Sequence, residues 1–124
     1  MNEAYVQRVA RLVERLAPVV AERDLRVRRV GADLVVLRLD LRFLDGRRFE
    51  GNEIWTAGAR KYRFHLQDPE GGLIWRLDNA PHHAEISTRP HHEHRAAGAV
   101  IPAGELTLED LLGAPERWSG NRTR

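Results

Sequence analysis

Histidines crowd one short stretch of the chain. Five of the six histidines lie between His82 and His94, within thirteen residues. Histidine gives and takes protons near neutral pH, so paired histidines suit general acid–base catalysis, and imidazole is also a common metal ligand. We therefore expect this stretch to carry the functional site. The candidate catalytic residues are His65, His82, His83, His91, His92 and His94.

Basic and polar residues precede the histidines along the chain. In cleavage of an RNA phosphodiester, one histidine deprotonates the attacking 2′-hydroxyl, another protonates the leaving oxygen, and arginine or lysine stabilises the charge on phosphorus. The combination favours an endoribonuclease that needs neither a metal nor another cofactor. The candidate substrate-binding residues are Lys61, Arg63, Arg76, Asp78 and Asn79.

Three other interpretations stay open. In the first, His92 and His94 lie on one side of an extended segment and bind a metal, with an earlier histidine as third ligand and Glu93 or Asp78 as the carboxylate. Their spacing matches no strong metal motif, but it would suit a metal-dependent hydrolase or a nucleotidyltransferase-like enzyme. The second is a non-enzymatic module that binds RNA or a protein. In the third, the histidines belong to a solvated loop without function.

Composition limits the class of protein. The 124 residues fit a single domain over residues 1–118, with a disordered tail at 119–124. The absence of cysteine excludes disulfides, thiolate metal sites and a cysteine nucleophile. Because the apolar runs are too short to span a bilayer and no signal peptide is evident, we expect a cytoplasmic protein without membrane contact. The net charge of +2 is too small to indicate nucleic-acid binding by itself.

Hydrophobic periodicity predicts the elements that position these residues. The spacing of apolar residues predicts an amphipathic helix from Asn2 to about Ala17, which Pro18 ends. From Leu25 the period changes to two, as in β-strands with one buried face. Asp45-Gly46 suits a type I′ hairpin, since both central residues of that turn need positive φ. After Asn79 the strand signals stop, and prolines and glycines predict an irregular segment.

A second hairpin and a short helix complete the expected fold. The hairpin turns at Asp68–Gly71, and pairing Phe64 with Trp75 separates a core face from a polar face. Thr107 is expected to cap a short helix over residues 108–112. The fold class is α+β: an N-terminal amphipathic helix on an antiparallel meander of four to five strands, an irregular histidine-rich segment and a short C-terminal helix. The polar face would carry Lys61, Arg63, His65, Gln67, Arg76 and Asp78.

Several blocks of the sequence resemble the TumE family of bacterial toxins. They are Tyr62-Arg63-Phe64-His65-Leu66-Gln67-Asp68, Gly72-Leu73-Ile74-Trp75-Arg76-Leu77-Asp78-Asn79-Ala80-Pro81-His82-His83, and Pro90-His91-His92-Glu93-His94, with a similar ending at 106–112. The resemblance covers about residues 30–112. It implies the toxin of a type II toxin–antitoxin pair, held inactive by a cognate helix-turn-helix antitoxin. The layout is also similar to that of RelE-like toxin ribonucleases, an analogy of fold alone.

Overall fold

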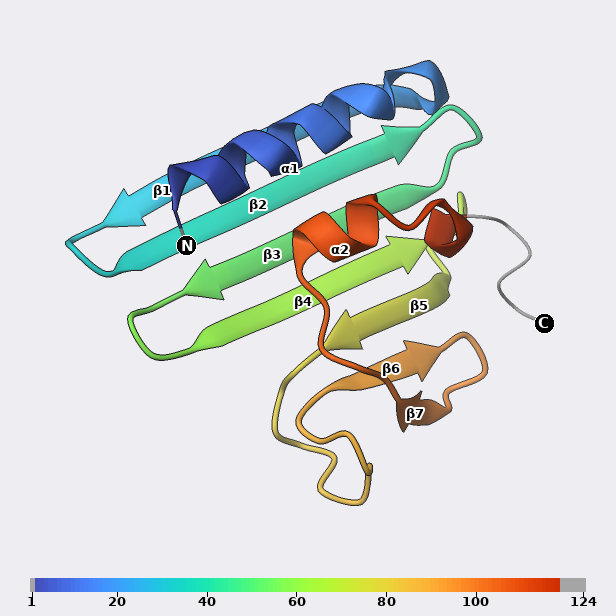
Figure 1. The fold of residues 1–124 in the computed structure, drawn as a ribbon. Helices are drawn as coiled ribbons and strands as arrows, with labels where there is room; N and C mark the ends of the chain where they lie inside the picture. Colours follow the sequence, from blue (N-terminus) through green and yellow to red (C-terminus); the bar gives the residue numbers. More distant parts are fainter. Residues whose placement is uncertain (1, 119–124) are drawn as a thin grey trace.

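A seven-stranded antiparallel sheet dominates residues 2–118, which are the residues that the computed structural model describes (Figure 1). Each strand pairs with the next one along the chain, so the sheet is a simple meander. The strands are β1 (Val20–Val30), β2 (Leu34–Phe43), β3 (Arg48–Trp55), β4 (Arg60–Gln67), β5 (Leu73–Asp78), β6 (His92–Arg95) and β7 (Val100–Pro102). The predicted tail, 119–124, lies outside the described residues.

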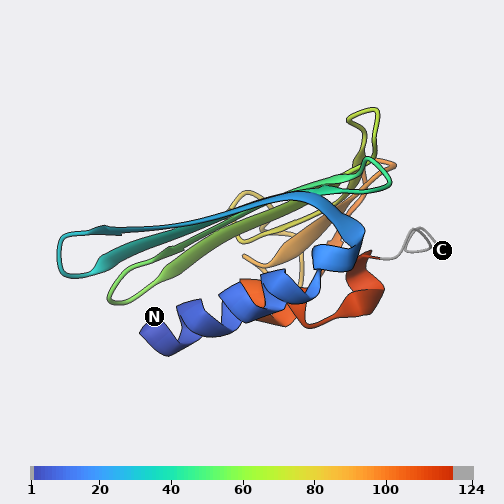
Figure 2. The same ribbon diagram turned by 90° about the horizontal axis from the view of Figure 1, so that it is seen from above.

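Both α-helices lie on the same side of the sheet, which we call the covered face (Figure 2). The helix α1 (Glu3–Arg15) begins at Asn2, whose side chain accepts a hydrogen bond from the backbone N–H of Tyr5, and a 3₁₀ turn at Ala17–Val19 follows it. The helix α2 (Leu108–Leu112) begins with a capping box between Thr107 and Asp110, and the 3₁₀ helix η2 (Pro115–Trp118) follows. Both predicted helices are confirmed.

The core lies between the helices and the covered face. Alternate residues of the central strands point into it, as a period of two requires. Leu39, Phe64 and Leu77 are fully or almost fully buried there, together with α1 residues such as Val9. No helix among the described residues packs on the opposite side, which we call the open face. None of the described helices is long and apolar enough to cross a membrane.

Two details of the hairpins differ from expectation. The strand β1 begins at Val20, five residues before the predicted start. The predicted type I′ turn is wrong, because Gly46 has a φ of 92° whereas Asp45 keeps a negative φ. The turn instead has three loop residues: the N–H of Gly46 donates to the Phe43 carbonyl, and the N–H of Phe43 donates to the Arg47 carbonyl.

The predicted pairing of the second hairpin is also wrong, although its two faces are right. Phe64 pairs with Leu77, and Trp75 pairs with Leu66. The turn uses three loop residues before Gly72, and a bulge follows next to Leu66, so the register moves by two residues. A shift of two preserves the face of every side chain.

The number of strands was underestimated. Instead of four to five strands and an irregular end, residues 92–102 add β6 and β7 to the edge of the sheet. The histidine segment is therefore irregular only between β5 and β6. Its last histidines belong to a paired strand, and pairing fixes the direction of their side chains.

Candidate functional site

Strand pairing gathers the polar candidates into two rows across the open face. In an antiparallel sheet, residues directly opposite each other point to the same face and lie close together. Because β6 pairs with β5, the histidines of β6 join residues of the second hairpin. From β3 to β6, the first row is Asn52, Arg63, Asp78 and His92, and the second row is Glu50, His65, Arg76 and His94.

Three histidines and one carboxylate converge at the end of these rows. Asp78 Oδ1 lies 2.9 Å from His92 Nε2, and Asp78 Oδ2 lies 3.6 Å from His94 Nε2. The Nε2 atoms of His92 and His94 are 3.1 Å apart. His83 reaches the same place from the segment between β5 and β6, and its ring centroid lies 4.7 Å from that of His92. We call these four residues the histidine cluster.

Burial and hydrogen bonds fix the cluster. The side chain of His92 is only 1% exposed, and its Nδ1 donates to the Pro90 carbonyl at 2.7 Å. That bond leaves the Nε2 of His92 directed at Asp78 and His94. Burial lowers the pKa of His94, and the positive charge of Arg76 lowers it further, whereas Asp78 opposes the change. A lower pKa favours the neutral imidazole, which is the form that accepts a proton or binds a metal ion.

A shallow groove of about 590 Å³ adjoins the cluster on the open face. Arg63, Arg76 and Lys61 line it, and His82 lies on its wall, exposed to solvent. Among the described residues, neither Lys61 nor Arg63 forms an ion pair within 4.0 Å, so both cations are available to a phosphate. Arg76 instead donates to Asp78 at 3.2 Å, which links the groove to the cluster.

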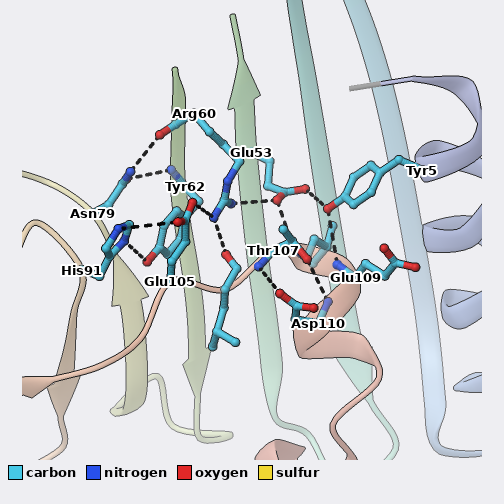
Figure 3. A network of polar contacts seen from close by, with 12 residues as sticks. Tyr5, Glu53, Arg60, Tyr62, Asn79, His91, Glu105, Thr107, Glu109 and Asp110 are labelled. Carbon is cyan, nitrogen blue, oxygen red and sulfur yellow. Dashed lines mark hydrogen bonds and ion pairs between the residues drawn. The ribbon is translucent and has the colours of Figure 1, made fainter. Parts of the chain in front are cut away.

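The remaining two candidate histidines lie apart from the cluster. His65 is separated from His94 by Arg76 of the intervening strand, which corresponds to about 10 Å. Burial lowers the pKa of His65, and Arg63 and Arg76 lower it further. His91 joins a different network, shown in Figure 3, where its Nδ1 lies 2.8 Å from the hydroxyl of Tyr62. The structure thus brings together three of the six histidines, with His82 beside them.

Asn79 is engaged by the backbone of β4. Its Oδ1 accepts from the N–H of Tyr62 at 3.0 Å, and its Nδ2 donates to the carbonyl of Arg60 at 2.8 Å (Figure 3). The amide thereby extends the pairing of β4 with β5 beyond the last strand residue and anchors the start of the segment that carries His82 and His83. Asn79 lines the groove, but both ends of its amide are occupied.

Replacing Asn79 by alanine is expected to lower the free energy of unfolding by about 1–3 kcal/mol, since two partly buried backbone groups lose their partner. Urea denaturation followed by tryptophan fluorescence measures the change. Asn52→Ala is the matched control, because among the described residues the Asn52 amide is held only by a 3.5 Å contact with Arg38. Equal losses in the two variants would contradict the anchoring role of Asn79.

A second polar network, on the covered face, was missed by the sequence interpretation. Glu53 is fully buried and accepts hydrogen bonds from Tyr5 of α1, Arg60 of β4 and the backbone of Leu108 in α2 (Figure 3). Burial raises the pKa of Glu53, and these three donors oppose that change. The network joins both helices to the sheet and lies on the side away from the cluster. It is therefore a structural feature.

Glu93 is not part of the histidine cluster. It points to the covered face, where it forms ion pairs with Arg95 at 2.7 Å and Arg117 at 3.1 Å. Of the two carboxylates considered for the metal alternative, the structure therefore brings Asp78 and not Glu93 to the histidines. The side chains of β6 alternate as predicted, with His92 and His94 on one side of the strand and Glu93 on the other.

Comparison with known proteins gives a match over nearly the whole chain. The model of the family described as Toxin TumE matches residues 9–119. The matched region includes the sheet, the cluster, the groove and α2. No curated protein and no solved structure matches significantly.

Proposed function

The chain belongs to the TumE toxin family, and from the histidines beside the basic groove we propose that it is an endoribonuclease that cuts RNA on the open face of its sheet. The family makes the chain a toxin component and implies an antitoxin of some kind. The observation that supports the proposal is the position of Asp78. This residue contacts His92 and His94, and it also lines the groove together with the basic residues Lys61, Arg63 and Arg76. Groups that move protons thus lie beside groups that bind phosphate.

The proposed reaction is an internal transesterification. The 2′-oxygen attacks phosphorus as its proton passes to a base, the bond from phosphorus to the 5′-oxygen breaks, and that oxygen receives a proton. The products end in a 2′,3′-cyclic phosphate and a 5′-hydroxyl. His82 carries one of the two protons, because it is the exposed histidine of the groove, and the histidine cluster serves the other position. Arg63, Lys61 and Arg76 bind phosphate oxygens.

The direct test is incubation of the purified chain, free of antitoxin, with RNA and with DNA of the same sequence. The expected result is cleavage of the RNA alone, with the product ends given above, since DNA has no 2′-hydroxyl. Growth inhibition on expression is measured in parallel. A chain that inhibits growth but leaves RNA intact would overturn the endoribonuclease proposal without affecting its place in the toxin family.

Removing the two unpaired cations of the groove should weaken RNA binding. For the double variant Lys61→Ala, Arg63→Ala, we expect weaker binding to all RNA sequences and a salt dependence shallower by about 1.4 in log K against log salt, about 0.7 for each lost phosphate contact. Filter binding over a range of salt concentrations measures both. The matched control is Arg11→Ala, Arg15→Ala on α1, which removes the same charge from exposed positions on the other side. An equal loss in the control would indicate a general charge effect.

Three finer points belong to this proposal: the type of antitoxin, the cellular location and the absence of a metal from the reaction. In this proposal the antitoxin is a helix-turn-helix protein, as the family resemblance implies. It covers the groove with an acidic surface, because Lys61 and Arg63 attract negative charge. Both proteins act in the cytoplasm. A neighbouring reading frame for such a protein, and its co-purification with this chain, would support the pairing. The metal-free version of the chemistry stays a prediction, and full activity in excess chelator would support it.

A further inference from the structure

We infer that His83, His92, His94 and Asp78 bind one divalent transition-metal ion of the Zn²⁺ class. The three histidines offer nitrogen atoms that all lie within 4.8 Å of one another, and Asp78 contributes a carboxylate at the same point. Imidazole and carboxylate are ligands that Zn²⁺ and its neighbours accept in four-coordinate sites. The binding of the ion stands on the cluster alone, and only its part in RNA cleavage rests on the proposed function.

The spacing of the ligand atoms suits a metal ion. With metal–nitrogen bonds of about 2.0–2.1 Å in a tetrahedron, neighbouring ligand atoms lie about 3.3 Å apart. The Nε2 atoms of His92 and His94 are 3.1 Å apart, and the oxygens of Asp78 lie at 2.9 Å from His92 and 3.6 Å from His94. Three ligands are therefore already near their bonded separation, and a nitrogen of His83, on a partly exposed segment, lies within 4.8 Å of those of His92 and His94.

The orientation of His92 points to the same conclusion. Its Nδ1 donates to the Pro90 carbonyl, so its Nε2 is the ring atom that faces the Asp78 carboxylate and the Nε2 of His94. A carboxylate and two imidazole nitrogens that converge on one point in this way are suited to holding a cation among them. A backbone carbonyl behind the ring is also the usual outer partner of a metal-bound histidine. Glu85 takes a similar position behind the Nδ1 of His83, at 3.3 Å.

A proton shared by Asp78 and His92 is the rival explanation. It would account for the 2.9 Å contact between the two side chains, but a shared proton needs only two acceptors. The rings of His83 and His94, 5.4 Å apart at their centroids, complete a set of four ligands that a proton does not require. The 1% exposure of His92 further suits a ligand better than a base that must reach the substrate. Because a nitrogen bound to the ion cannot also take a proton, the cluster would then act in cleavage by supplying a water of lowered pKa or by polarising a phosphate oxygen, in place of the imidazole chemistry of the metal-free proposal.

The test measures metal binding rather than activity. The full chain, with any polyhistidine tag removed and with metal stripped by chelator, is titrated with ZnCl₂ in a calorimeter, and Co²⁺ absorption reports a tetrahedral site. We expect one ion per chain with a micromolar or lower Kd. His94→Ala should weaken binding at least a hundredfold, whereas His65→Ala, on the same face but outside the cluster, should leave it unchanged. Circular dichroism checks folding, and His83→Ala replaces His94→Ala if the latter is unfolded.

The results separate this inference from the proposed function. Failure to bind Zn²⁺ or Co²⁺ below about 100 µM, or equal affinity of the His94→Ala and wild-type chains, would overturn the metal site even if the chain cleaves RNA. A chain that binds the ion with the expected dependence on His94, yet cleaves no RNA, would leave the site established and overturn only the endoribonuclease.

Discussion

Asp78→Asn is expected to slow RNA cleavage at least about a hundredfold while the fold stays intact. Asparagine has the shape of aspartate and keeps an oxygen for the backbone N–H of Ala80, which donates to Asp78 Oδ1 at 3.0 Å. It has no negative charge to offset the positive charge that collects at His92 during proton transfer or on metal binding. Loss of one such preorganised charge typically costs a hundredfold or more. The initial rate of cleavage and growth inhibition on expression both measure the effect.

The matched control for this variant is Asp40→Asn. Asp40 also lies on the open face, in the row of Glu50 and His65, but on β2, three strands away from Asp78. It pairs with Arg38 at the surface and has no contact with the cluster. We expect wild-type cleavage for it. If Asp78→Asn keeps a rate within threefold of the wild type, Asp78 is not the link between groove and cluster.

The period of two explains why the strand faces could be predicted from the sequence. Tyr62, Phe64 and Leu66 alternate with polar residues, so burying the apolar side chains allowed only one assignment of the two faces. The pairing could not be predicted in the same way. A shift of two residues places every side chain on the same face, so the hydrophobic pattern does not distinguish Phe64–Trp75 from Phe64–Leu77. The extra loop residue and the bulge determine which of the two pairings forms.

The strand β6 carries no hydrophobic signal at all. Its inward residues Glu93 and Arg95 are charged, and on the covered face Glu93 forms ion pairs with both Arg95 and Arg117, while His92 and His94 point outward. Because hydrophobic alternation is absent here, the sequence alone indicates a loop. This strand is nevertheless what assembles the site, because pairing with β5 places His92 opposite Asp78. The sequence could predict the shared side of His92 and His94, but not their partner.

The sequence contained an indication that Glu53 is buried, which our interpretation did not use. Glu53 follows Phe49 at even spacing in β3, with Gly51 between them, so alternation directs it into the core. An acidic residue at a core position of a strand needs partners, and only the folded chain shows that these come from α1, β4 and α2. The side chain of Arg60, 6% exposed, is held by this carboxylate at 2.9 Å.

Replacing Glu53 by alanine should therefore lower the free energy of unfolding by about 3–5 kcal/mol, because it leaves the buried guanidinium of Arg60 with the exposed carboxylate of Glu105, at 3.1 Å, in place of a buried counter-charge. Tyr5 and the backbone of Leu108 lose their acceptor at the same time. Urea denaturation measures the loss. Glu50→Ala is the control on the same strand, since Glu50 is exposed on the open face and should cost about 0.5 kcal/mol or less. A loss below about 1 kcal/mol for Glu53→Ala would mean that water replaces the carboxylate, and that the helices do not depend on this network.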